Sequence, residues 1–60
     1  MAVVYLRWQE GEQTYQAAHE NVKAAQAQAA VEANRAFLGI YDGPHEDAKK
    51  LESVKGASNG

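Results

Sequence analysis

The sequence contains no cysteine and only one proline among its 60 residues. Without cysteine the chain cannot form a disulfide, bind zinc through thiolates or use a thiol nucleophile. The absence of cysteine also fits a reducing compartment. Because the N-terminus lacks a basic segment followed by a long apolar region, we expect a cytoplasmic or particle-associated protein rather than a secreted one.

Clustered charge and long hydrophobic runs are missing as well. Six Lys and Arg against eight Asp and Glu give a formal net charge of −2, and the basic residues are scattered along the chain. Nucleic acid is therefore not expected as a partner, because binding it requires a basic patch. No apolar run approaches the roughly 20 residues that cross a bilayer, so no membrane partner is expected either.

Large apolar side chains are few. Hydrophobic residues make up 45% of the chain, but twelve of them are alanine. Ordering one residue costs about 1.5 kcal/mol, whereas burying a large apolar side chain gains roughly 1.5–3 kcal/mol. Alanine adds little burial and favours helix. The composition predicts a mainly α chain that is not a self-contained globule and relies on a protein partner, either other subunits or its own copies.

Residues 1–10 are predicted to form a short extended or strand-like arm. The valine, tyrosine and tryptophan side chains favour β-structure, and alternation places Val4, Leu6 and Trp8 on one apolar face. No second strand-like run is evident, and a lone strand leaves both of its edges without hydrogen-bond partners. The arm is expected to pair with another molecule; the alternative is that it folds back on the following helix.

Residues 12–38 are predicted to form one long amphipathic helix. The segment has no glycine or proline and is rich in alanine, glutamine and glutamate. Gly39 follows it, where a left-handed residue commonly ends a helix. Ala25, Ala29 and Ala33 recur at four-residue spacing and form an alanine seam that lets a neighbouring helix approach closely. The alternative is that the alanines serve helix propensity alone.

The arm and the alanine-rich face of the helix supply the residues predicted to bind a partner. On the helix these residues share one broad apolar face at 3.6-residue periodicity. The predicted partner-binding set is Val4, Tyr5, Leu6, Trp8, Tyr15, Ala18, Val22, Ala25, Ala29, Ala33, Ala36 and Phe37.

The remaining residues are predicted to form a turn, a short helix and a tail. The turn covers 39–43, where the pair Asp42-Gly43 is a turn signal. Pro44 suits the first position of a short helix over 44–55, which has only three apolar residues on its stripe. Residues 56–60 are expected to be a flexible tail.

No pattern of residues predicts catalysis, a cofactor site or a metal site. The chain has no glycine-rich phosphate loop, and its serines occur only near the C-terminus. His19 is expected to be a half-buried interface residue. His45 precedes two acidic residues, but consecutive helical residues point about 100° apart and do not converge on one ion. We therefore expect a protein that is not an enzyme.

These expectations lead to two candidate functions. The first is a structural or assembly subunit of a larger complex that binds its neighbours through the arm and the alanine seam. Minor components of virions and of multi-subunit enzymes are analogies for such a chain. The alternative is a small acidic binding regulator or inhibitor of a larger protein, which would use the same surfaces transiently. A regulator should fold cooperatively by itself, whereas a permanent subunit should be only partly folded alone.

Overall fold

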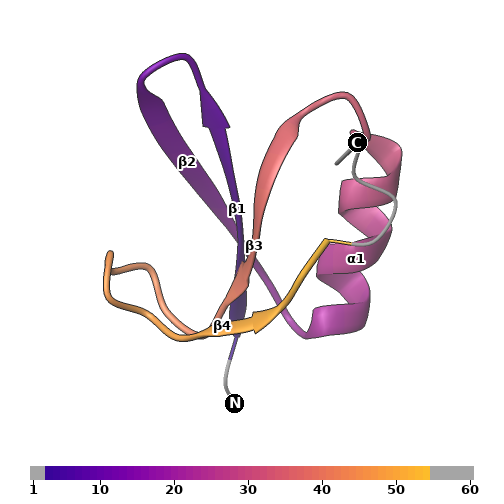
Figure 1. Cartoon of the computed structure of the whole chain (residues 1–60). Helices are drawn as coiled ribbons and strands as arrows, with labels where there is room; N and C mark the ends of the chain where they lie inside the picture. The colour runs from indigo at the N-terminus through magenta and orange to yellow at the C-terminus, as the bar shows by residue number, and fades with distance from the viewer. Residues whose placement is uncertain (1–2, 55–60) are drawn as a thin grey trace.

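Residues 3–54 fold as one antiparallel sheet with a single helix against one face (Figure 1). The computed structural model describes residues 3–54. The elements follow in the order β1 (Val4–Glu10), β2 (Gln13–His19), α1 (Val22–Val31), β3 (Ala36–Tyr41) and β4 (Lys50–Glu52). The strand order in the sheet is β2-β1-β3-β4, and every neighbouring pair is antiparallel. The prediction of a mainly α fold is therefore wrong.

Strands β1 and β2 form a hairpin with a two-residue turn at Gly11 and Glu12. Gly11 has a φ of 64°. Within residues 3–54 only glycines have a positive φ, so the φ of Glu12 is negative. A positive φ at the first turn position alone is the type II′ pattern, whose twist matches that of the flanking strands. The predicted helix 12–38 is wrong over this first part. Pairing with β1 satisfies the backbone of these residues and outweighs the helix propensity of alanine and glutamine.

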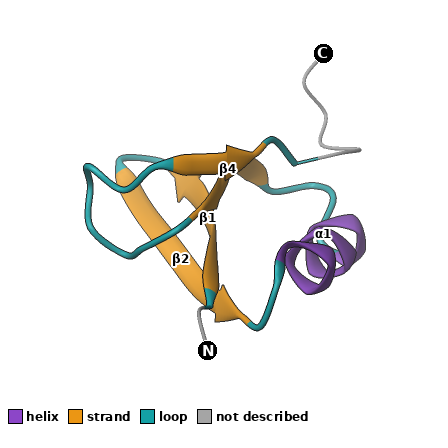
Figure 2. Cartoon of the chain, turned by 90° about the horizontal axis from the view of Figure 1, so that it is seen from below, coloured by secondary structure: helices purple, strands orange, loops and turns teal. Residues whose placement is uncertain are grey.

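Helix α1 occupies only the middle of the segment that was predicted to be helical. Asn21 is the N-cap, with an extended backbone and a side-chain oxygen that accepts a hydrogen bond from the Ala24 N–H at 2.8 Å. Figure 2 shows α1 to one side of the sheet. Ala25 and Ala29 are 0% and 2% exposed and belong to the core together with residues of the sheet. Ala33 lies beyond the helix and is exposed. Within the described chain, the alanine seam is thus a contact between α1 and the chain's own sheet.

Strand β3 lies beside β1 and begins inside the predicted helix. Its register with β1 shifts between Arg7 and Trp8, which leaves Leu38 as the extra residue of a β-bulge. Gly39 has a φ of 145°, and a Cβ at this position would lie 2.5 Å from the Lys50 side chain. The positive φ favours glycine here, while the Lys50 side chain is flexible and could move aside; Gly39 lies within β3 and does not end a helix as predicted.

A loop and strand β4 occupy the region of the predicted turn 39–43 and short helix 44–55. Asp42 closes the loop, because its Oδ1 accepts the Lys49 N–H at 2.9 Å and its own N–H donates to the Lys49 carbonyl at 3.0 Å. An amphipathic helix docks through a broad apolar face, and the three apolar residues of this segment are too few to form one. The predicted tail 56–60 lies outside the described residues.

The core lies between α1 and the sheet. Its buried apolar residues are Val4, Leu6, Ala25, Ala29 and Ile40, with Val22, Phe37 and Val54 packed against them. The Cα radius of gyration is 10.5 Å, close to the roughly 10 Å of a compact chain of this length. The prediction that the chain is not a self-contained globule is therefore wrong. The reason is that the predicted arm contains β1, which is paired on both edges within the chain.

The loop after β3 covers the other face of the sheet and is held there by Arg7. Arg7 is only 8% exposed. Its guanidinium donates hydrogen bonds to the carbonyl oxygens of His45 at 2.9 Å and of Gly43 at 3.4 Å. The same group lies 4.0 Å from the centre of the Tyr41 ring. Burial of this cation is tolerated because carbonyl oxygens and an aromatic face replace water around it.

We expect Gly11→Ala to lower the free energy of unfolding by about 1 kcal/mol, because alanine resists a positive φ. Glu12→Ala, one residue further along the same exposed turn, should change it by no more than about 0.5 kcal/mol. Urea denaturation of both variants measures the difference. Equal effects of the two substitutions would contradict the hairpin turn.

We expect Ala29→Leu to destabilise the chain by roughly 1–3 kcal/mol, because the added carbons overfill the contact between α1 and the sheet. Ala30→Leu is the matched control, since Ala30 is its exposed neighbour on the same helix. Thermal and urea unfolding provide the readout. Unchanged stability of Ala29→Leu would show that this helix face does not pack on the sheet.

Candidate functional site: the outer edge of strand β2

Strand β2 is one edge of the sheet and pairs only with β1 among residues 3–54 (Figure 1). The hairpin closes on Glu10 and Gln13, and hydrogen-bonded and non-hydrogen-bonded pairs alternate along an antiparallel ladder. The odd-numbered residues of β2 therefore direct their backbone groups towards β1. The N–H and C=O groups of Thr14, Gln16 and Ala18 point outward from the sheet.

The two edges of the sheet differ in how they are protected against another strand. Strand β2 runs for seven residues without Lys, Arg, Asp, Glu or Pro, and its register with β1 has no shift. Strand β4 has three residues, of which Lys50 and Glu52 are charged, and its register with β3 shifts. Short length, charge and bulges are the usual means of blocking an edge. The edge at β4 is thus blocked, while the edge at β2 is open.

A row of three aromatic rings crosses the sheet and ends at the open edge. The centres of the Trp8 and Tyr15 rings are 6.0 Å apart with a 28° angle between their planes. Trp8 and Phe37 are 6.3 Å apart at 70°, an edge-to-face arrangement. Tyr15 is the outermost ring and is 44% exposed. Its ring packs on Trp8 and leaves a large apolar surface beside the outer edge of β2.

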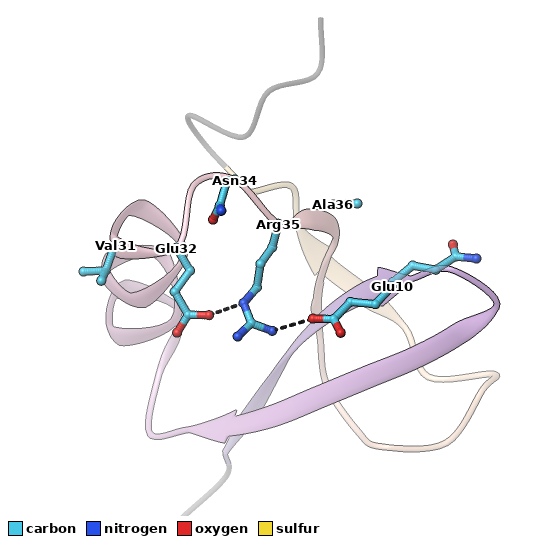
Figure 3. A pocket seen from close by; sticks show the side chains of 7 residues that line it. Glu10, Val31, Glu32, Asn34, Arg35 and Ala36 are labelled. Carbon is cyan, nitrogen blue, oxygen red and sulfur yellow. Dashed lines mark hydrogen bonds and ion pairs between the residues drawn. The ribbon is translucent and has the colours of Figure 1, made fainter.

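Arg35 lies between Glu32, which caps the end of α1, and Glu10 of β1 (Figure 3). Its guanidinium lies 4.6 Å from the centre of the Trp8 ring, and Nη1 bonds Glu10 Oε2 at 3.0 Å. Nε also forms an ion pair with Glu32, and Trp8 Nε1 donates to Glu10 Oε2 at 3.1 Å. The hollow of about 530 Å³ beside Arg35 therefore contains a cation that two carboxylates already neutralise. We assign these contacts a structural role.

The structure separates the twelve residues that were predicted to bind a partner. Those in or against the core are Val4, Leu6, Val22, Ala25, Ala29 and Phe37. Tyr5 and Trp8 are partly buried on β1, and the exposed ones are Tyr15, Ala18, Ala33 and Ala36. Only Tyr15 and Ala18 of the whole set lie on the open edge strand.

The sequence analysis did not identify the outward N–H and C=O groups of Thr14 and Gln16. It therefore did not identify β2 as an edge strand of the sheet. One signal was available: the pair Gly11-Glu12 separates two segments of alternating residues, which is typical of a hairpin. The second segment is difficult to recognise because alanine and glutamine fill most of it. Asn21 was a second signal, since asparagine is a preferred N-cap and marks a helix start well after residue 12.

The histidines and carboxylates of the described residues do not gather at one place. Among residues 3–54 no group of three or more His, Cys, Asp or Glu is placed to hold a metal ion. His45 Nε2 lies 3.8 Å from Asp47 Oδ1 in an exposed pair. His19 Nε2 is buried and has no hydrogen-bond partner in the described part of the chain. No helix there is both long and apolar enough to span a membrane.

We expect Ala18→Pro to fold and Ala17→Pro to be severely destabilised. Proline at 18 removes an outward N–H, whereas proline at 17 removes a ladder hydrogen bond to Leu6 and costs about 1–3 kcal/mol for the unpaired carbonyl alone. Circular dichroism and urea denaturation of the two variants test this. The opposite order of stability would show that the outward groups have been misassigned.

Comparisons with protein-family models, with curated proteins and with solved structures find no match to this chain.

Proposed function

We propose that the chain is a non-catalytic structural or assembly subunit that binds a protein partner by strand addition to the outer edge of β2. One observation carries the proposal: β2 is a seven-residue edge strand without charge, proline or bulge, in a sheet whose other edge has charge and a bulge. An open edge of this kind pairs readily with a further strand.

Backbone hydrogen bonds would supply the affinity of this edge. Thr14, Gln16 and Ala18 offer their N–H and C=O groups to a strand lying alongside, and each bond contributes about 0.5–1.5 kcal/mol net. Tyr15 would add apolar contact next to them. The sum is a few kcal/mol before the cost of association, which suits one contact among several in an assembly.

The alternative is a small acidic binding regulator that uses the same edge transiently. The observation that favours it is the closed core formed by α1 and the sheet, because such a chain folds without its partner. A regulator would dissociate rapidly from its target and leave a folded monomer. A subunit would remain bound through purification of the complex.

A photoreactive residue on the edge tests the proposal. With p-benzoylphenylalanine in place of Thr14, we expect crosslinking to a protein chain on irradiation, either in the purified protein or in the expressing cells. The matched control replaces Leu51, which is exposed on the blocked edge strand β4. The reaction at position 14 should be lost with Ala18→Pro, which removes one outward N–H. No crosslink from position 14 in either setting would contradict the proposal.

A further inference from the structure

We infer that the occupant of the open edge is a second copy of the same chain, bound through antiparallel pairing of β2 with β2. Tyr15 of one copy would lie opposite Tyr15 of the other. This inference rests on the proposed function and specifies its partner. It joins two four-stranded sheets into one sheet of eight strands, with both α1 helices on the same face.

Hydrogen bonding limits the registers in which β2 can pair with the β2 strand of a second copy. The outward backbone groups of β2 belong to even-numbered residues, so even-numbered residues of one copy must meet even-numbered residues of the other. Three registers with long overlap satisfy this rule. They centre the pairing on Tyr15, on Gln16 or on Ala17.

Charge and capping decide among these registers. Centring on Gln16 places Glu12 opposite the second copy's Glu20, and symmetry repeats this like-charge pair at the other end. Centring on Ala17 places Asn21 opposite Gln13, although Asn21 is already committed as the N-cap of α1. Centring on Tyr15 pairs Gln13 with Ala17 and Thr14 with Gln16, and every such pair is uncharged.

The aromatic row independently favours the Tyr15 register. Phe37, Trp8 and Tyr15 already lie side by side across three strands, and Tyr15 is 44% exposed at the end. In this register the two Tyr15 residues form a non-hydrogen-bonded pair, where side chains approach most closely. The row would continue unbroken through six rings. A pair of aromatic rings contributes about 0.5–1.5 kcal/mol beyond the area that it buries.

The blocked edge explains why association would stop at two copies. After pairing, each outer edge of the joined sheet is β4, which has three residues, two of them charged. A symmetric contact between identical edges closes on itself, whereas unlike edges would form a filament. A dimer is therefore the expected end state.

Cysteine pairing in a chain without natural cysteine tests both the partner and the register. We expect a mixture of Gln13→Cys and Ala17→Cys chains to form a mixed disulfide under mild oxidation, because these residues lie opposite each other in the Tyr15 register. The mixed product should exceed the disulfide of either variant alone by about tenfold. Leu51→Cys on β4 serves as the matched control and should remain monomeric. This design leaves Tyr15 in place.

Analytical ultracentrifugation of the unmodified chain supplies the second readout. We expect a concentration-dependent dimer, weakened about tenfold or more by Ala18→Pro, which removes an outward N–H from both copies. A monomer at all concentrations overturns the inference. If the photoreactive residue at 14 then captures a different protein, the proposed function stands. If Gln13→Cys pairs preferentially with His19→Cys, the register centres on Gln16 and the Tyr15 pairing is overturned.

Discussion

The whole fold depends on the pairing of β1 along both of its edges. The hairpin with β2 satisfies one edge and the ladder with β3 satisfies the other, so Val4 and Leu6 become the middle of the core. Without β2 the strand would expose its backbone to water, and without β3 the core would lack Ile40. Because β1 is paired on both sides, the edge strands of the sheet are β2 and β4. The edge that we propose as the binding site is a consequence of this strand order.

The small side chains on the buried face of α1 let this one helix pack closely on the sheet. Ala25 and Ala29 let the helix backbone lie close to the sheet, where Leu6 and Ile40 are the largest fully buried side chains of the described residues. A core with so few large side chains yields only a few kcal/mol of net stability. The Arg7 contacts with the loop carbonyls and the Arg35 contacts with Glu10 and Glu32 hold the periphery in place. Pairing of two copies would add further apolar burial at Tyr15.

Local sequence signals could predict part of this fold but not its architecture. Alternation over Val4, Leu6 and Trp8 was readable and indicated a strand. Over residues 12–38 alanine, glutamine and glutamate dominate and favour helix, but this is a weak preference that strand pairing readily outweighs. The positive φ of Gly11 and the bulge at Leu38 are consequences of tertiary pairing and were not visible as periodicity. Gly11-Glu12 could have indicated the hairpin, but that β2 is an edge strand depends on the strand order, which local signals do not give.

The absence of charge on β2 is informative because charge would be easy to accommodate there. Thr14 and Ala18 are exposed, so a lysine at either position would bury no charge and would protect the edge. Gln16 differs, because its side chain accepts a hydrogen bond from Arg7 and donates one to the Pro44 carbonyl. The chain instead places its acids just outside the strand, at Glu12 and Glu20. Charges at those positions leave the centre open to pairing but penalise any register that brings them face to face. If a strand binds this edge, as we propose, the neutral middle and the acidic ends would restrict the register in which it pairs.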